Sequence, residues 1–497
     1  MPELSHRRRM LVLAICCMSL LIVSLDTTAL NVALPAMRRE LDASVAGMQW
    51  TIDAYTLVLA SLLMLAGSTA DRIGRRKVFM AGLVLFTLGS ALCSLAPNLE
   101  ALIAFRMVQA VGGSMLNPVA MSIITNTFTD PRERARAIGV WGGVVGISMA
   151  AGPVAGGLLV DSVGWRSIFW VNLPVGIAAL LLTWRYVPES RAHRARRPDP
   201  VGQLLVITLL GSLTYAIIEA PQKGWVSAEI LLFASLAAAS LAGLLMYEPR
   251  RADPLIDLRF FRSAPFSGAT VIAVSAFAGL GGFLFLNTLY LQDVRGLSAL
   301  EAGLYTLPMA AMVCVLAPLS GRLVAARGPR IPLLVAGCAM AVSGLMLAAF
   351  DAETGTVSMF AAYVLFGLGF GMVNAPITNT AVSGMPRSQA GVAAAVASTS
   401  RQIGQTLGVA VIGAALAAGM SGAGSSAGAT DGFVAASRPG WWIVTGCGLC
   451  VLLVGALSSG RWARDTARRT AERLAEPGTG DMDALPAAQS SAARTSS

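Results

Sequence analysis

Two carboxylic acids and one arginine stand inside long apolar runs of this chain: Asp26, Asp53 and Arg106. An ionisable group deep in a hydrophobic segment is costly, and such groups usually mark an ion or substrate pathway. At 1.5 Å per residue, we expect Asp26 roughly 10 Å from the end of its segment, Asp53 about 8 Å into its own and Arg106 roughly 10 Å into its own. Three charges at one level can form a proton site, because apolar surroundings favour the neutral carboxyl and the arginine favours its charged form.

A permanently paired structural cluster is the alternative interpretation of these residues. Both interpretations stay open for Arg106. Asp53 lies nearer to the end of its segment, where contact with water would explain an acid equally well. Asp26 has Thr27 and Asn31 as polar neighbours, which favours a functional role.

The second half of the chain carries one arginine of this kind, Arg401, expected about 15 Å into an apolar segment. It either lines a cavity or braces its helix by bonding carbonyl groups, and the sequence does not separate the two. Polar residues that we predict to line a substrate cavity are Thr27, Asn31, Gln109, Asn287, Arg401 and Gln405.

These charges must be positioned by helices that cross a bilayer. The 497 residues are 55% hydrophobic and 13% charged, with a mean hydropathy of +0.67, so polar groups are too few to cover a soluble globule of this size. A crossing helix needs about 20 apolar residues. Fourteen such runs begin near Met10, Met48, Val78, Leu99, Arg136, Ser167, Val201, Ser227, Pro265, Leu300, Ile331, Val357, Gly391 and Trp441.

The net charge of +10 sets orientation and does not indicate nucleic-acid binding, because the basic residues lie in short loops between apolar runs. With an even number of spans, most of the 37 Lys and Arg fall on the side of both termini, which predicts cytoplasmic termini. The longer connections are Pro188–Pro200, Glu248–Arg262 and a Gly/Ser/Ala-rich outer loop, Gly419–Arg438, which we expect to be flexible. Beyond Arg461 we expect a basic helix on the membrane surface and then disorder.

Enzyme chemistry finds little support. The pattern Gly-x-Ser-x-Gly at residues 424–428 has no strand or helix context, and both histidines, His6 and His193, lie in basic flanks on the other side. These flanks also leave no metal site of the usual kind. No phosphate-binding loop is present, so energy is expected from an ion gradient.

A cluster of charged residues lies between the second and third apolar runs, and its residue types suggest a structural role. Glycines there allow close helix approach, the acid can bond helix-end donors and the arginines anchor at an anionic surface. The residues concerned are Gly67, Asp71, Arg72, Gly74, Arg75 and Arg76. A second copy at Gly321–Arg330 has Ala325 in place of the acid, and such duplication is typical of transporters.

Small residues and a proline mark the fifth run, which should pack tightly and bend. They are Gly146, Gly152, Pro153, Gly156 and Gly157.

Together these segments resemble the major facilitator superfamily, and within it the fourteen-span drug:proton antiporter branch typified by EmrB and QacA. The stretches that carry the resemblance are Asp26–Pro35, Trp50–Leu57, Gly67–Lys77, Arg106–Gly113, Trp165–Pro174 and Pro254–Leu258. It implies an all-α membrane fold of two pseudo-symmetric six-helix bundles with two extra central helices. It also implies that Gly67–Lys77 latches the bundles together, that the fifth-run motif is an antiporter motif, and that Asp26 and Arg106 take part in proton transfer.

The domain organisation that follows is 1–187 for the first bundle, 188–262 for loops and the inserted helix pair, 263–460 for the second bundle and 461–497 for a cytoplasmic tail. The expected function is proton-coupled export of amphiphilic organic compounds across the cytoplasmic membrane, giving drug resistance, without a cofactor other than the proton gradient. A passive facilitator or sensor with structural acids is the alternative, and an importing symporter is disfavoured by the fifth-run motif. The expected partners are these compounds, protons and the bilayer; a monomer is compatible with the sequence, which leaves the oligomeric state open.

Overall fold

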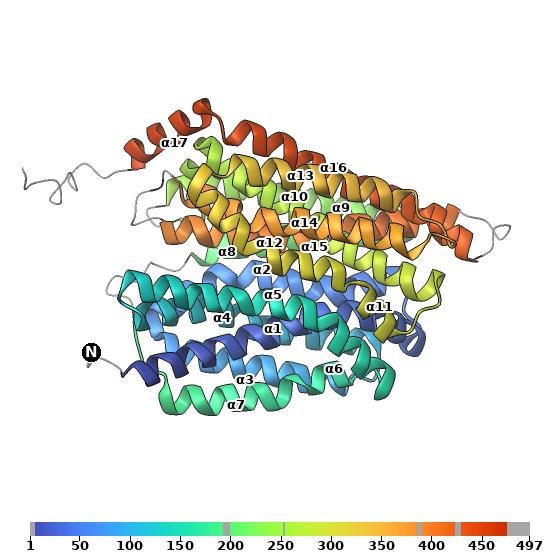
Figure 1. The fold of residues 1–497 in the computed structure, drawn as a ribbon, viewed down its shortest axis with the longest axis horizontal. Coiled ribbons are helices and arrows are strands. Elements are labelled where there is room, and N and C mark those ends of the chain that lie inside the picture. The colour runs from blue at the N-terminus through green and yellow to red at the C-terminus, as the bar shows by residue number, and fades with distance from the viewer. Residues whose placement is uncertain are drawn as a thin grey trace, which may run out of the picture.

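A computed structural model describes residues 5–191, 199–251, 254–383, 385, 390–422 and 429–474, and these residues form helices and connecting turns (Figure 1). The first group is α1 (His6–Leu41), α2 (Val45–Ile73), α3 (Arg75–Ser94), α4 (Leu99–Thr127), α5 (Pro131–Ser162), α6 (Ser167–Trp170) and α7 (Asn172–Tyr186). A pair follows, α8 (Pro200–Lys223) and α9 (Ala228–Tyr247). The last group is α10 (Ala264–Leu289), α11 (Ala299–Tyr305), α12 (Leu307–Arg327), α13 (Arg330–Ala348), α14 (Thr356–Val382), α15 (Ala390–Gly422), α16 (Ala429–Ser458) and α17 (Arg461–Leu474).

Fourteen helical segments among the described residues are long and apolar enough to cross a membrane, which confirms the predicted number. Two of them are broken helices: α6 with α7, and α11 with α12. A π-helical turn at Tyr290–Val294 extends α10, and 3₁₀ turns at Glu248–Arg250 and Leu258–Arg262 lie in the connection after α9.

The predicted boundary between the last two membrane spans is wrong. Helix α15 continues to Gly422 and α16 begins at Ala429, twelve residues before the predicted start at Trp441. Most of the predicted outer loop Gly419–Arg438 is therefore helical, and residues 423–428 lie outside the described part. The glycine and serine content of this segment is typical of a flexible linker, which explains the prediction. Its alanines are strong helix formers and favour the observed helix. The basic helix predicted beyond Arg461 is present as α17, and the tail beyond Leu474 lies outside the described residues.

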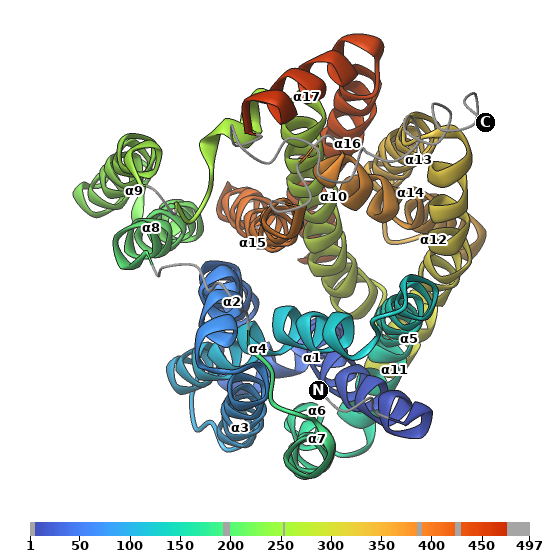
Figure 2. The ribbon, with the colours of Figure 1, turned by 90° about the vertical axis from the view of Figure 1, so that its left-hand side faces the viewer.

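The helices form two halves with a pair at their edge (Figure 2). In one half α1 packs on α5, and α4 packs on both α2 and α3. In the other, α10 packs on α15, α12 on α14, and α13 on α16. Helices α8 and α9 pack on each other, and α8 contacts α2 and α15. This is the predicted all-α arrangement of two bundles with an inserted pair.

Local sequence explains where the helices begin and end. Side chains cap several N-termini: Ser44 accepts from the Gly47 amide, Asn98 from Ala101, and Ser298 forms a capping box with Glu301. Gly74, at φ +130°, separates α2 from α3, since a positive φ of this kind is accessible to glycine.

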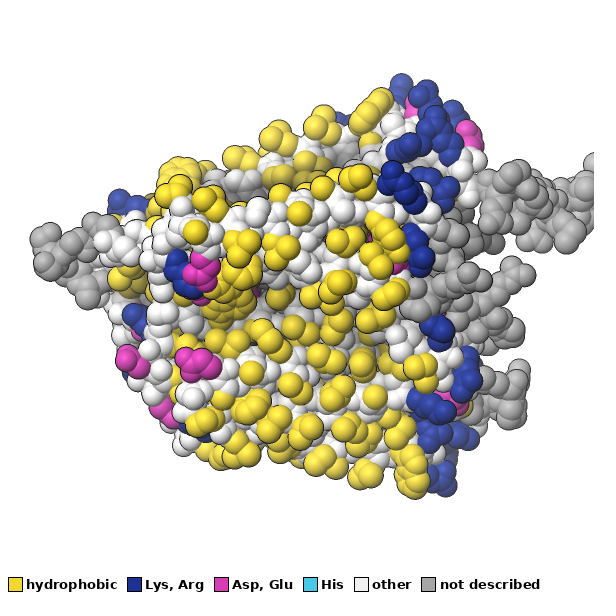
Figure 3. Space-filling model, turned by 180° about the vertical axis from the view of Figure 1, so that it is seen from behind, with side chains coloured by type: hydrophobic (Ala, Val, Ile, Leu, Met, Phe, Trp, Pro, Cys, Tyr) yellow, Lys and Arg dark blue, Asp and Glu magenta, His cyan; other side chains and the backbone are white. Residues whose placement is uncertain are grey.

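The molecule has two chemically different ends (Figure 3). Lys and Arg gather at the end where α1 begins, where Gly74 joins α2 to α3 and where α17 lies; we call it the basic end. The opposite end, where α1 ends at Leu41 and α2 begins at Val45, is called the far end.

Contacts between the two halves gather toward the far end. Asp161 of α5 accepts from the amides of Ala299 and Leu300 at 3.2 and 2.8 Å. Arg38 pairs with Asp293 at 3.2 Å. At mid-depth the Thr406 hydroxyl of α15 donates to that of Thr56 of α2 at 2.8 Å. Within the described ranges, no hydrogen bond or ion pair joins α1–α7 to α10–α16 nearer to the basic end than this one.

Candidate functional site

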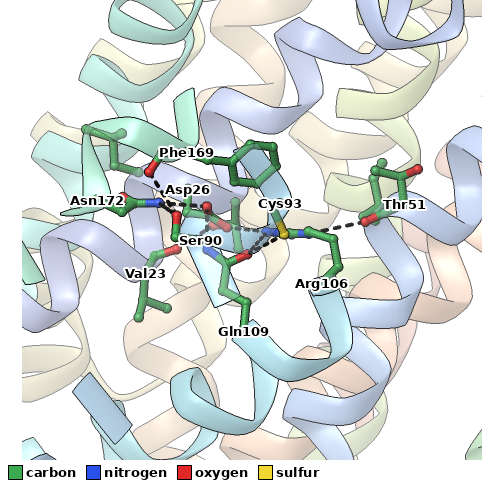
Figure 4. A network of polar contacts seen from close by, with 12 residues as sticks. Val23, Asp26, Thr51, Ser90, Cys93, Arg106, Gln109, Phe169 and Asn172 are labelled. Carbon is green, nitrogen blue, oxygen red and sulfur yellow. Dashed lines mark hydrogen bonds and ion pairs between the residues drawn. The ribbon is translucent and has the colours of Figure 1, made fainter. Parts of the chain in front are cut away.

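A buried polar network lies inside the first half, where four helices meet (Figure 4). Helix α1 supplies Asp26, α3 supplies Ser90, α4 supplies Arg106 and Gln109, and α7 supplies Asn172. Each of the five is at most 1% exposed. A set of polar groups this deep in an apolar bundle must satisfy itself, because no solvent can replace a missing partner.

Asp26 is the centre of the network. Arg106 Nη1 donates to Asp26 Oδ2 at 2.5 Å and to Gln109 Oε1 at 2.7 Å. Gln109 Nε2 and Asn172 Nδ2 each donate to Asp26 Oδ1 at 2.9 Å. Asn172 Nδ2 also approaches Ser90 Oγ at 3.0 Å. Every partner of Asp26 is a donor, and such a set fits the charged carboxylate.

Aromatic rings and backbone enclose the arginine. The guanidinium carbon of Arg106 lies 4.2 Å from the ring centroid of Tyr55, and its Nε donates to the Thr51 carbonyl at 3.4 Å. The Tyr55 hydroxyl is buried without a hydrogen-bond partner. This enclosure isolates the ion pair from water and strengthens its electrostatic attraction.

Glycines bring the helices of the network close enough to meet. A Cβ on Gly89 of α3 would lie 2.6 Å from the backbone of Gln109, and one on Gly112 of α4 would lie 2.3 Å from the amide nitrogen of Phe86. Arg106 and Gln109 are three residues apart on α4 and so share one helix face.

Asp53 lies elsewhere. With Gln49 and Thr56 it forms the face of α2 that packs against α15, where Gln49 Nε2 donates to the carbonyls of Val409 and Ala410 at 3.1 and 2.8 Å. The Asp53 side chain is 0% exposed, and its Oδ1 accepts from Thr56 at 3.5 Å. Its Oδ2 has no hydrogen-bond partner among the described residues. The structure thus brings Asp26 to Arg106 and not to Asp53. Helix α1 also runs further than expected, which places Asp26 about 22 Å from its end at 1.5 Å per residue.

The predicted cavity residues divide evenly, since Asn31, Gln109 and Asn287 are buried while Thr27, Arg401 and Gln405 are partly exposed. Asn31 is 4% exposed and donates to the carbonyl of Thr27, whose hydroxyl bonds its own helix. Asn287 is 1% exposed and accepts from the Tyr363 hydroxyl at 2.5 Å. Gln405 is partly exposed on α15. Gln109 belongs to the network above.

The charged turn after α2 is built around its own residues. Arg75 donates to Asp71 at 2.8 Å, Gly74 makes the turn, and the Arg76 amide donates to Glu189 Oε1 at 3.1 Å. Glu189, missed from the sequence, is held in the connection after α7. Gly67 lies near Pro118, and Arg72 is exposed.

The small residues of α5 make close contacts on both sides. A Cβ on Gly152 or Gly156 would collide with Thr28 or Ala29 of α1. A Cβ on Gly157 would lie 2.5 Å from the Ala299 carbonyl of α11, where the Pro153 carbonyl meets Gly303. A Cβ on Gly146 would lie 3.3 Å from Cys314 Sγ of α12.

Sequence reasoning missed three members of the central site: Asn172, Ser90 and Tyr55. Asn172 lies within Trp165–Pro174 and Tyr55 within Trp50–Leu57, two of the stretches that carry the family resemblance. Both residues could therefore have been singled out from the sequence. Ser90 carried none, since a serine in an apolar helix is common. No group of three or more His, Cys, Asp or Glu in the described residues could hold a metal ion.

Comparison with protein families identifies the chain. Residues 16–409 match the family model described as Major Facilitator Superfamily. The chain belongs to the major facilitator superfamily. This transporter is 39% identical over 408 residues to the multidrug resistance protein Stp of Mycobacterium tuberculosis, covering 82% of this chain and 76% of the relative. It is 39% identical over 395 residues to the tetracenomycin C resistance and export protein of Streptomyces glaucescens, covering 79% and 73%.

A third relative is the methylenomycin A resistance protein of Streptomyces coelicolor, 36% identical over 78% of this chain and 82% of the relative. Among solved structures, a bacterial homologue of the lysosomal transporter Spinster, in an inward-facing and occupied conformation, aligns with a TM-score of 0.66. That alignment covers 95% of this chain and 99% of the other at 18% identity, and it supports the fold. The chain is therefore a multi-pass membrane transporter and not an enzyme.

Proposed function

We propose that this transporter exports amphiphilic organic compounds, including antibiotics, across the cytoplasmic membrane in exchange for protons. The relatives support the direction, since their names describe multidrug resistance and export. The observation that carries the coupling is the Asp26–Arg106 pair, a carboxylate and a guanidinium buried together at 2.5 Å inside one half.

The proposed orientation places the basic end in the cytoplasm. The excess of Lys and Arg at that end supports this assignment, because positively charged loops are retained inside. The contacts between the halves lie from mid-depth to the far end. In this orientation they support a state closed to the outside, in which substrate enters from the cytoplasm.

Asp26 is the proposed proton acceptor. Its three donor partners fit the charged form in the state described. A proton on Asp26 would remove the countercharge of Arg106 and add a donor where every neighbour is already a donor. Proton binding therefore disfavours this network, which joins α1, α3, α4 and α7, and favours another arrangement of these helices. Substrate and proton then occupy the transporter alternately.

Asp53 is the proposed second acid of the cycle. It lies in the contact between α2 and α15 with no cation beside it, so burial favours its neutral form while the halves are closed. Loss of that proton would place an uncompensated charge in the closed contact, which favours separation of the halves at this point.

Inside-out vesicles with an acidic interior test the proposal. Adding ethidium to the outside should release protons from vesicles that contain the wild-type protein, and dye should accumulate inside. Asp26→Asn should abolish both responses. Glu472→Gln, which removes one partner of the exposed ion pair with Arg468 on α17, is the matched control and should retain proton-linked uptake.

A passive facilitator gives a different result. It would equilibrate ethidium without proton release, and collapse of the proton gradient would leave its rate unchanged. Full uphill uptake by the Asp26→Asn variant would refute the role of Asp26, whatever the direction of transport.

A further inference from the structure

Arg401, in the second half, is a cation without an acidic partner among the residues that the structure describes. It lies on α15, eleven residues from the start of that helix or about 16 Å along it. Its Nη2 donates to the Thr378 hydroxyl of α14 at 2.5 Å, and its guanidinium carbon lies 5.9 Å from the ring centroid of Phe277 of α10. Its Nε is buried and has no hydrogen-bond partner within the described part of the chain. None of these contacts is with a backbone carbonyl, so helix bracing does not explain the residue.

Arg401 and Arg106 differ in whether an acidic side chain balances their charge. Arg106 is neutralised by Asp26, whereas no acid stands at depth in the second half. Between residues 264 and 458 the acids are Asp293, Glu301, Asp351, Glu353 and Asp431. All lie at the far end: Asp293 ends the α10 segment, Glu301 begins α11, Asp431 begins α16, and the other two lie between α13 and α14. A cation within an apolar bundle is costly unless an opposite charge compensates it, and no acidic side chain in the described protein does so.

The surroundings of Arg401 define what would compensate it. Thr378 is exposed four residues before the end of α14 at the basic end, and Arg401 is partly exposed, so the guanidinium is reachable from that end. Phe277 also packs edge to face on Phe370 at 5.1 Å, which places an aromatic wall beside the charge. A guanidinium, one hydroxyl and two rings match a ligand with an anionic oxygen group on an aromatic or apolar body.

We propose that Arg401, with Thr378 and Phe277, forms a recognition site for the anionic group of an amphiphilic aromatic substrate, such as a carboxylate, a sulfonate or an ionised phenol. This rests on the proposed export function and names one class among the compounds exported. The site opens to the basic end, so an anion binds it from the cytoplasmic side in the proposed orientation. The bound anion supplies the charge that Arg401 lacks.

Two pyrene probes of similar size test the proposal by fluorescence titration of the purified full-length protein. Pyrene-1-sulfonate carries a permanent negative charge and pyrenemethanol carries none. Wild type should bind the sulfonate more tightly. Arg401→Gln should weaken sulfonate binding about 10- to 100-fold and leave pyrenemethanol binding unchanged, because a hydrogen bond to a charged group is lost. The sulfonate affinity of Arg401→Lys should lie between those of wild type and Arg401→Gln. Thr378→Val should lose less sulfonate affinity than Arg401→Gln.

Three results would overturn the assignment: no sulfonate binding by wild type, equal loss for both probes, or unchanged sulfonate affinity in Arg401→Gln with a wild-type melting temperature. A fourth arm uses a short-chain phosphatidylglycerol, because a lipid headgroup offers the same chemistry. Displacement of the sulfonate by equimolar lipid would assign the site to lipid and reject an exported compound. Ethidium uptake by the Arg401→Gln variant tests export separately, because a cationic substrate gains no attraction from the Arg401 guanidinium.

Discussion

The pair of Asp26 and Arg106 shows how a bilayer protein keeps charge inside. Both side chains are at most 1% exposed. Besides each other, Asp26 contacts the amide groups of Gln109 and Asn172, and Arg106 contacts a backbone carbonyl and aromatic rings. Forming such a pair from hydrated ions gains little net stability, because both must lose their water. Breaking it is a different matter, since the remaining charge has no compensation. The intact pair thus adds little to the stability of the fold. Replacing only one of its two residues is nevertheless strongly destabilising, so the two must be replaced together.

Removing one partner should therefore harm the fold more than removing both. We expect Asp26→Asn to lower the free energy of unfolding by about 3–5 kcal/mol, because Arg106 is left as an unpaired buried charge. The double variant Asp26→Asn with Arg106→Gln should recover most of this loss and still lack proton coupling. Thermal unfolding in detergent measures the first quantity and vesicle uptake the second.

Glu472→Gln serves as the stability control. Its partner Arg468 lies four residues earlier on the exposed face of α17, where an ion pair contributes only about 0–1 kcal/mol. Additive losses in the Asp26 and Arg106 variants would contradict the coupled pair.

At the level of elements, α5 belongs to one half and touches the other. Its glycines face α1 through Gly152 and Gly156 and face α11 through Gly157. Sequence alone predicted a tightly packed helix at this position and could not say which neighbours it would meet. The same limit explains Asp53: the spacing of Gln49, Asp53 and Thr56 defines a helix face, but only the fold shows that this face meets α15.

A methyl group at Gly157 should open the far end. Its Cβ would lie 2.5 Å from the Ala299 carbonyl, so Gly157→Ala should cost about 1–3 kcal/mol in the contact between α5 and α11. We expect a lower yield of bismaleimide cross-linking between Arg38→Cys and Asp293→Cys, whose native side chains form an ion pair across the halves.

Gly139→Ala is the matched control on the same helix, because no atom lies within 4 Å of the added Cβ. Both alanine variants should be compared in a background free of the native cysteines. Equal cross-linking yields for Gly157→Ala, Gly139→Ala and the parent would show that this contact does not hold the far end closed.

For the whole molecule, the number of spans was predictable because a bilayer demands a minimum apolar length. The boundary of α16 was not, since its first turns are rich in alanine, glycine and serine and carry Asp431 and Arg438, which resemble loop sequence. The residues of the buried network were partly predictable from their charge. Their grouping was not, because it depends on four helices, one of which supplies the neutral Asn172.

Orientation in the membrane can be checked by labelling. In a cysteine-free background, Glu353→Cys at the far end should react with a membrane-impermeant maleimide in intact cells. Lys77→Cys at the basic end should react only after permeabilisation, because the excess of positive charge there keeps it inside. Both positions are exposed, so accessibility within the protein is matched. The opposite pattern would reverse the proposed direction of transport.

The glycines of α5 have a mechanical consequence. Side chains that interdigitate must come apart before two helices can shift, which makes ordinary cores resist small displacements. Where α5 carries glycine, no side chain has to be withdrawn before the helices shift. This holds at Gly152 and Gly156, which meet α1, and at Gly157, which meets α11. A rocking motion between α5 and α11 would have to break the hydrogen bonds of Asp161 with the amides of Ala299 and Leu300, so polar contacts of this kind would set the energetic barrier to changing access.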